Sequence, residues 1–201
     1  MEGPRPHLIL ASSSPRRQQL LAEAGYDFEA IVPDIPEPDS SFGKLPPAQQ
    51  AESLAYFKAR VVADEHPGGL VLGADTIVAV ANQVLGKPAD RAEAERMLRA
   101  LSGTRHQVIT GMALLRPDGR RLIASDLTHV TMRAITNGEI QQYLDSGEWQ
   151  GKAGAYAIQE TADRFVQAVE GSFTNVVGLP MEMLAQMLRQ VAKAPKAPGS
   201  W

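Results

Sequence analysis

A short apolar run that ends in serines and a proline is the feature that most constrains how this chain can fold. Residues 7–11 read His-Leu-Ile-Leu-Ala, a pattern that predicts a buried strand. Pro15 follows Ser12–Ser14, and proline suits the first position of a helix because its missing N–H needs no partner there. Apolar residues then continue at helical spacing until Gly25. We therefore expect a strand, a serine-rich turn and a helix.

Strand and helix patterns alternate along the rest of the chain. Strands are predicted at residues 28–32, 69–81, 84–85, 106–116, 121–133, 155–158 and 164–169, and helices at 48–64, 91–101, 137–146 and 181–191. Pro117-Asp118-Gly119 separates two long strand patterns and is typical of a tight turn, so these strands should form an antiparallel hairpin. Alternating elements together with a hairpin predict an α/β fold with a mixed, twisted central sheet and flanking helices.

The length of the chain bounds its organisation. With 201 residues, it can form one sizeable domain or two small lobes around one cleft. We expect a single domain to span residues 1–191. The segment 192–201 carries two prolines and two lysines, and it is predicted to be a flexible tail.

Charge and composition argue against several classes of protein. A net charge of −3, from 20 basic and 23 acidic side chains, provides no broad cationic surface, so binding to long nucleic acid is not expected. The absence of cysteine excludes disulfides, thiolate metal sites and a cysteine nucleophile, and it fits a cytoplasmic location. No run of about eighteen apolar residues occurs, so we expect no membrane span.

The turn after the first predicted strand has the composition of an anion site. Hydroxyl groups and backbone N–H groups at a helix start converge on one point, and the helix dipole makes that point positive. Arg16 and Arg17 lie in the predicted first turn, where the dipole disfavours cations unless an anion is present. The alternative is an ordinary serine cap followed by solvated arginines. Taken alone, a string of this kind is more often that simple cap.

Asp75 interrupts the apolar, β-branched pattern of residues 69–81. A carboxylate in such a strand is costly unless it has partners or faces a cleft. Asp75 could therefore bind a metal ion or accept a proton from water. A strand-end aspartate that pairs with a neighbour is the equally good alternative.

Other candidate residues are weaker when each is taken alone. Lys58 lies on a predicted helix and Lys87 follows a glycine before a proline, so either could reach a phosphate or could be an ordinary surface lysine. Glu37 lies in a proline-rich loop and carries no signal of its own. His106 begins a strand, where a lone histidine is more often structural than catalytic. The histidines have no metal-site spacing, and there is no glycine-rich Walker loop.

The string LILASSSPRR at residues 8–17 resembles the opening motif of the Maf family of nucleotide pyrophosphatases. Further segments resemble family motifs in the same order: LAYFKA at 54–59, GADT at 73–76, GKP at 86–88, LSGTRHQVIT at 101–110, KAGAY at 152–156 and GSFTNVVGLP at 171–180. Each motif is modest evidence, but their common order extends the resemblance over residues 7–190.

The resemblance implies a fold and a reaction. The implied fold is α/β with two lobes around a deep cleft, similar to the inosine-triphosphate pyrophosphatases. The implied reaction converts a nucleoside triphosphate to the monophosphate and pyrophosphate with a divalent cation, Mg²⁺ or Mn²⁺. By resemblance, Asp75 is the proton acceptor, and Asp75 and Glu37 are the acidic positions for the metal. The implied substrate-binding residues are Ser12, Arg16, Arg17, Glu37, Lys58 and Lys87.

The resemblance also distinguishes branches of the family. Arg17, Thr76 and Gln159 match the marker positions of the branch that acts on dTTP and UTP, which implies those substrates or modified pyrimidine triphosphates. One alternative is a pyrophosphatase for 7-methyl-GTP or other modified purines. Another is a nucleotide-binding regulator of septum formation without enzymatic activity. Members of the family often form homodimers, so a homodimer is possible here.

Overall fold

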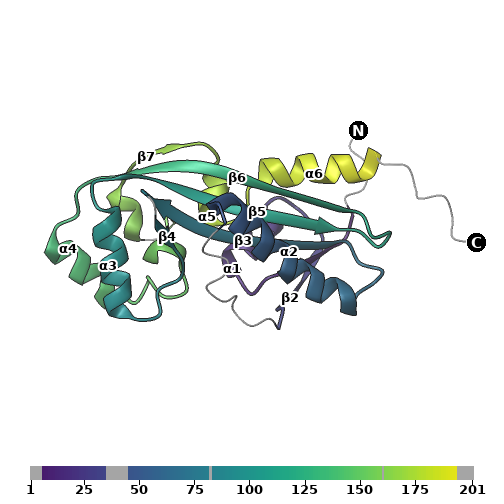
Figure 1. Cartoon of the computed structure of the whole chain (residues 1–201), viewed down its shortest axis with the longest axis horizontal. Coiled ribbons are helices and arrows are strands. Elements are labelled where there is room, and N and C mark those ends of the chain that lie inside the picture. The colour runs from purple at the N-terminus through teal and green to yellow at the C-terminus, as the bar shows by residue number, and fades with distance from the viewer. Residues whose placement is uncertain (1–5, 35–44, 82, 160, 194–201) are drawn as a thin grey trace, which may run out of the picture.

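A single mixed sheet organises residues 6–34, 45–81, 83–159 and 161–193, which are the residues that this computed structural model describes (Figure 1). Its strands are β1 (Leu8–Ala11), β2 (Phe28–Ile31), β3 (Val71–Val80), β4 (Gln83–Leu85), β5 (Arg105–Leu115), β6 (Arg121–Met132) and β7 (Val166–Glu170). The helices are α1 (Pro15–Glu23), α2 (Pro47–Glu65), α3 (Arg91–Leu101), α4 (Asn137–Asp145), α5 (Phe173–Val177) and α6 (Met181–Lys193).

The strand order is β2-β1-β3-β5-β6-β7, and β4 pairs separately with β3. Strand β1 is parallel to both β2 and β3, whereas the other pairs are antiparallel. The predicted mixed sheet and the predicted hairpin of the two long strands are therefore confirmed. Asp90 and Thr136 cap α3 and α4, since each side chain accepts a bond from a backbone N–H in the first turn of its helix.

One edge of β3 is shared by two short strands. Strand β5 pairs with β3 along the opposite edge, from Val71 to Ala79. On the shared edge, β1 pairs with β3 up to Gly73, and β4 pairs with it from Val78 onward. Among the described residues no strand pairs with residues 74–77 at this edge. We call this interruption the β3 gap.

Helix α2 lies close against the sheet because small residues meet there. A Cβ atom on Gly73 of β3 would lie 2.1 Å from the carbonyl oxygen of Ala55, and one on Gly111 of β5 would lie 2.2 Å from the carbonyl carbon of Ala51. Both distances are far below van der Waals contact. These glycines therefore let the backbone of α2 approach the two strands directly.

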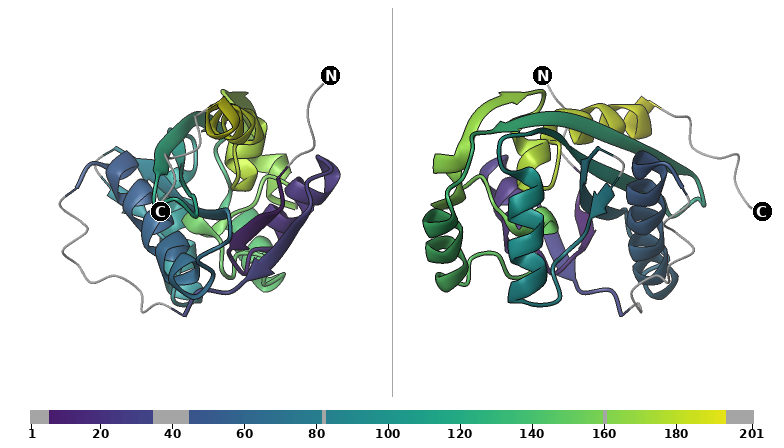
Figure 2. Two further views of the ribbon diagram at one scale, coloured as in Figure 1. Left: turned by 90° about the vertical axis from the view of Figure 1, so that its right-hand side faces the viewer. Right: turned by 60° about the vertical axis from the view of Figure 1, so that its left-hand side comes forward.

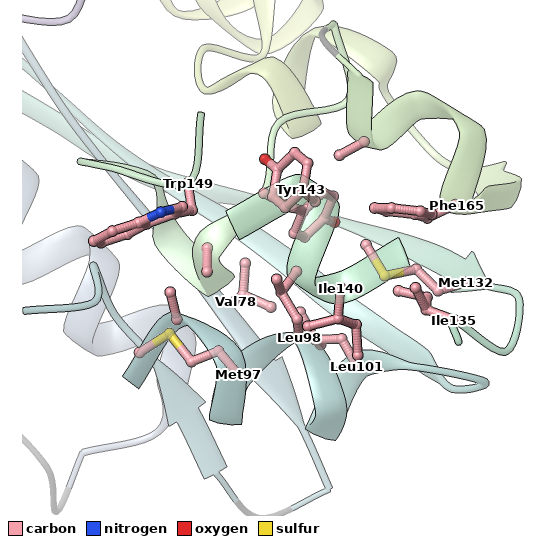
Figure 3. Packing of buried hydrophobic residues seen from close by; sticks show 14 of the residues in the cluster. Val78, Met97, Leu98, Leu101, Met132, Ile135, Ile140, Tyr143, Trp149 and Phe165 are labelled. Carbon is pink, nitrogen blue, oxygen red and sulfur yellow. The ribbon is translucent and has the colours of Figure 1, made fainter. Parts of the chain in front are cut away.

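The opposite face of the sheet is covered by α1, α6 and the segment around α5. Leu72 and Ala74 of β3 pack there with Leu184 and Leu188 of α6. Figure 2 shows α2 and α6 on different sides of the strands. Beyond the β3 gap, α3 and α4 form a separate cluster, in which Leu98 and Leu101 lie close to Ile140 (Figure 3). The arrangement fits the expected two lobes, and the single domain at 1–191 stays a prediction.

Three sequence-based expectations were wrong in part. Residues 155–158 do not form a strand, because a 3₁₀ turn at Ala153–Ala155 places Gly154 and Ala155 at positive φ. The strand expected at 164–169 begins only at Val166, after a second 3₁₀ helix at Thr161–Phe165. Helix α6 continues through Lys193, past the expected start of the tail, and residues 194–201 lie outside the described residues. None of the helices described is long and apolar enough to cross a membrane.

Candidate active site

A cleft of about 840 Å³ opens at the β3 gap. Its lining includes the sequence-predicted residues Ser12, Arg16, Arg17, Lys58, Asp75, Thr76, Lys87 and Gln159. They come from β3, from the segments that follow β1 and β4, from α2 and from the loop after the 3₁₀ turn at Ala153–Ala155. The fold thus brings distant motifs to one place. Glu37, the other predicted acidic residue, lies outside the described residues.

Lys58 and Asp75 face each other inside this cleft and form an ion pair. Asp75 is the register partner of Gly111 on β5. Because glycine has no side chain, the space beside Asp75 on this face of the sheet is open to α2, which carries Lys58. The side chains are 20% and 13% exposed, respectively. Burial lowers the pKa of Lys58, and the negative charge of Asp75 partly offsets that effect. Asp75 therefore has the partner that a carboxylate in an apolar strand requires.

Arg17 is a buried arginine whose guanidinium is held by three protein groups. Its Nε donates to the carbonyl oxygen of Gly178 at 2.8 Å. Its Nη1 donates to Ser12 Oγ at 3.0 Å, and its Nη2 donates to Thr76 Oγ1 at 3.1 Å. Burial lowers the pKa of Arg17, while Asp75 acts in the opposite direction. Arg17 therefore joins α1, β3 and the end of α5 around the cleft.

Two threonines continue this buried polar network across the sheet. The Thr76 and Thr110 hydroxyl oxygens are 2.9 Å apart, and Thr110 also donates to the backbone carbonyl of Asn175 at 3.1 Å. The Asn175 amide group donates to the carbonyl oxygen of Val108 and to Thr128 Oγ1. Sequence reasoning gave Thr110 and Asn175 no role. Their polar side chains in otherwise apolar motifs were the available signal.

The start of α1 has the form expected for an anion site. Ser14 is the N-cap residue and its side chain makes no capping bond, while Pro15 occupies the first turn. Ser12 Oγ accepts a bond from the Ser14 N–H at 3.2 Å. Within the part of the chain that the structure describes, no side chain caps the first-turn N–H groups of α1, and Arg16 lies beside them in the cleft lining.

His106 is structural, as its isolation in the sequence predicts. Its Nε2 lies 2.8 Å from the hydroxyl oxygen of Tyr156, which lines the cleft. Burial lowers the pKa of His106 to about 4, so the ring is neutral at neutral pH. Its Nδ1 has no hydrogen-bond partner among the described residues. Lys152 also lines the cleft, and sequence reasoning gave it no functional role.

Comparison with known proteins identifies the family. A family model described as Maf-like protein matches residues 7–191. The chain belongs to the Maf family. A relative named dTTP/UTP pyrophosphatase from Symbiobacterium thermophilum is 50% identical over 91% of this chain and 93% of its own length. A protein of the same name from Ruminiclostridium cellulolyticum is 45% identical over 92% of this chain and 96% of its own length.

A solved structure supports the fold of this Maf protein. The structure of a HAM1 protein from Coxiella burnetii matches with a TM-score of 0.53 and 21% sequence identity, over 94% of this chain and all of that chain. At this identity the match shows a shared fold and carries no statement about activity. The architecture expected from the sequence is therefore confirmed.

The chemistry of the cleft fits a cation that arrives with a phosphate ligand. Within the described residues, no three histidine or carboxylate side chains gather in the manner of a resident metal site. Mg²⁺ is commonly bound by one or two carboxylates together with substrate phosphates, and Asp75 is one such carboxylate in the cleft. The residues present therefore fit a metal ion that is shared with the substrate.

Proposed function

We propose that this Maf protein is a nucleoside-triphosphate pyrophosphatase that hydrolyses dTTP and UTP to the monophosphate and pyrophosphate. The observation that carries the proposal is the Lys58–Asp75 ion pair in a cleft that is also lined by Arg16 and Lys87. The names of the relatives, at 42–50% identity, support the substrate. A carboxylate surrounded by cationic side chains suits the hydrolysis of a polyphosphate.

The triphosphate is held by positive groups on two sides of the cleft. Arg16 and the start of α1 provide one side, and Lys58 and Lys87 provide the other. Lys58 and Lys87 are close enough that Lys87 contributes to lowering the pKa of Lys58, so an anion between them relieves a repulsion. The guanidinium of Arg17 is already held by protein groups. Arg17 therefore shapes this site and can keep its position when the triphosphate binds.

Asp75 accepts the proton of the attacking water. In the free protein its charge is compensated by Lys58. A bound triphosphate competes for the Lys58 ammonium, which leaves the Asp75 carboxylate available to a water molecule near the α-phosphate. Positioned bases of this kind contribute about 10²–10⁴-fold to a rate. The substrate thus prepares its own base by drawing Lys58 away.

A divalent cation, Mg²⁺ or Mn²⁺, neutralises phosphate charge when it is bound. Asp75 would hold it, together with Glu37, whose role stays a prediction from the sequence. Thr76, Arg17 and Gln159 line the same cleft, and we assign the base to the part that they border. A cytoplasmic location and a homodimer also stay predictions.

A panel of triphosphates tests this function. Pyrophosphate release is measured with Mg²⁺ or Mn²⁺ for dTTP, UTP, CTP, dATP, GTP, ITP and 7-methyl-GTP. We expect release from dTTP and UTP at rates at least about tenfold above the other substrates. Preferential release from 7-methyl-GTP would support the modified-purine alternative. Binding of nucleotides without release from any of them would support the non-enzymatic regulator instead.

A further inference from the structure

Thr76 lies in the β3 gap and lines the cleft. In the parallel pair of β1 and β3, the Ile9 N–H donates to the carbonyl oxygen of Leu70, and Ile9 is the register partner of Val71. In this pattern the even-numbered residues of β3 direct their N–H and C=O groups toward β1. The same alternation directs the N–H and C=O of Thr76 into the β3 gap.

Two further observations support this direction. Thr76 and Thr110 are register partners, and their hydroxyl oxygens lie only 2.9 Å apart, as expected for a pair without mutual backbone hydrogen bonds. In addition, Val80 and Gln83 close the short hairpin of β3 and β4, and the closing pair of a two-residue hairpin exchanges backbone bonds. Val80 and Thr76 are both even-numbered residues of β3, so the backbone N–H and C=O groups of both point toward this edge.

The side chain of Thr76 has little capacity left for a ligand. Its hydroxyl accepts a bond from Arg17 and contacts Thr110 Oγ1, and it lies 3.4 Å from the carbonyl oxygen of Gly178. Because Thr110 donates its only proton to the Asn175 carbonyl, Thr76 must donate toward Thr110 or Gly178. The backbone groups of Thr76 are therefore better placed than its hydroxyl to bind a ligand in the gap.

The N–H donor and the C=O acceptor of Thr76 lie side by side. Together they select a ligand that carries an acceptor and a donor next to each other. A phosphate fits poorly, because the Thr76 carbonyl oxygen would face its negative charge. A base that carries a ring N–H next to a carbonyl fits both groups, and thymine and uracil have this imide edge. We propose that the main chain of Thr76 recognises the N3–H and an adjacent carbonyl of the pyrimidine, a role that rests on the proposed function.

The two faces of β3 separate this recognition from the chemistry. Asp75 lies on the face covered by α2, where Lys58 meets it, while the Thr76 side chain lies on the opposite face with Arg17. With the base edge in the plane of the sheet, the Lys58–Asp75 pair on the α2 side stays available to the phosphates. In the orientation that sets N3 and the group at C4 against Thr76, cytosine presents an acceptor at N3 and a donor at N4, so it opposes both backbone groups of Thr76. This edge therefore gives a physical basis for selecting uracil and thymine over cytosine.

Binding of ligand analogues to the whole protein tests the proposal without turnover. Calorimetry compares α,β-imido analogues of UTP, CTP and 3-methyl-UTP, of which the CTP analogue adds no bulk. We expect the CTP and 3-methyl-UTP analogues to bind at least about 100-fold more weakly than the UTP analogue. Equal affinities for the UTP and CTP analogues would overturn the proposal, even if UTP is hydrolysed. Conversely, selective binding of the UTP analogue by a protein that releases no pyrophosphate would support base recognition by the Thr76 main chain and reject the proposed function.

The variant Thr76→Val separates the main chain from the hydroxyl, because valine keeps the shape and the backbone of threonine. We expect both analogues to bind less well, since Arg17 loses a partner, but the preference for the UTP analogue should stay within about threefold of the wild type. A preference that disappears would assign recognition to the hydroxyl and refute the main-chain role. Thr76→Ala, which also lacks the hydroxyl, serves as the second variant if valine impairs folding, and Thr110→Val is the control for loss of a hydroxyl away from the gap.

Discussion

The ammonium of Lys58 on α2 and the carboxylate of Asp75 on β3 form an ion pair at the centre of the cleft. This pair joins the two functions that the chain must combine. The pair compensates the negative charge of a carboxylate in the middle of an apolar strand. It also holds a lysine next to the position where phosphate is expected. In the proposed mechanism, substrate binding and exposure of the base are linked through the same ammonium group.

Replacement of Lys58 by methionine tests this link. The variant leaves the partly buried Asp75 charge without its partner, so we expect a loss of about 1–3 kcal/mol in the free energy of unfolding. The value of kcat/KM for dTTP should fall at least about 100-fold, because a phosphate contact is also lost. Urea unfolding and pyrophosphate release measure the two effects. The control is Arg60→Met, which breaks an exposed ion pair with Asp64 on the same helix. A Lys58→Met protein as active as that control would contradict this role.

Gly73→Ala tests the close approach of α2 to the sheet. The added methyl group would overlap the carbonyl oxygen of Ala55, and relief requires α2 to move away from β3. We expect a loss of about 2–4 kcal/mol in stability and a large loss of activity, since Lys58 moves with α2. Gly138→Ala is a matched control, because nothing lies within 4 Å of its added methyl group. Thermal unfolding of both variants, with wild-type behaviour expected only for the control, provides the measurement.

Arg17→Lys tests the buried network. Lysine keeps the charge but cannot reach the groups of Ser12, Thr76 and Gly178 with the geometry of a planar fork. We expect a loss of about 1–3 kcal/mol in stability and a smaller preference for UTP over CTP in kcat/KM. Arg16→Lys, on the less buried neighbour, should chiefly raise KM. Equal base preference in Arg17→Lys and wild type would show that this network does not shape the base site.

The neutral, buried ring of His106 predicts a dependence of stability on pH. In the unfolded chain this group takes up a proton near its ordinary pKa of 6.5, whereas in the folded protein burial lowers the pKa to about 4. The His106 contribution is therefore fully present above pH 6.5 and is lost as the pH falls toward 4, by up to about 3 kcal/mol. Urea unfolding at several pH values should show this loss, and His106→Gln should flatten it. The carboxyl pKa of Glu139 is lowered to about 2 by Arg133, so that group acts in a separate, more acidic range.

The sequence predicted the elements that have strong local signals. The strand, serine turn and helix at the N-terminus and the hairpin turn at 117–119 depend on nearby residues, and each is present. The segment after Lys152 was expected as a strand from its apolar composition. The positive φ of Gly154 and Ala155, where Gly154 packs against Val78, depends on tertiary contacts that no local pattern reveals.

In the candidate site, too, some features follow from local sequence patterns and others depend on tertiary contacts. The residues that line the cleft could be selected from motifs, but their relationships could not. The family resemblance implied that Lys58 and Arg17 bind substrate, which stays a prediction, and it said nothing of their protein partners. In the structure Lys58 pairs with Asp75, and Arg17 binds three protein groups. The β3 gap arises only because two short strands share one edge of β3, which is a property of the topology.

Analysis of the products formed from dTTP by the wild type and by Asp75→Asn tests the central claim most directly. Asparagine keeps the shape of the side chain and removes the base, so nucleotide binding should persist by calorimetry while turnover falls about 10²–10⁴-fold. We predict that the wild type releases dTMP and pyrophosphate in equal amounts with Mg²⁺ or Mn²⁺. Formation of dTDP and phosphate, or turnover by Asp75→Asn at the wild-type rate, would contradict the account.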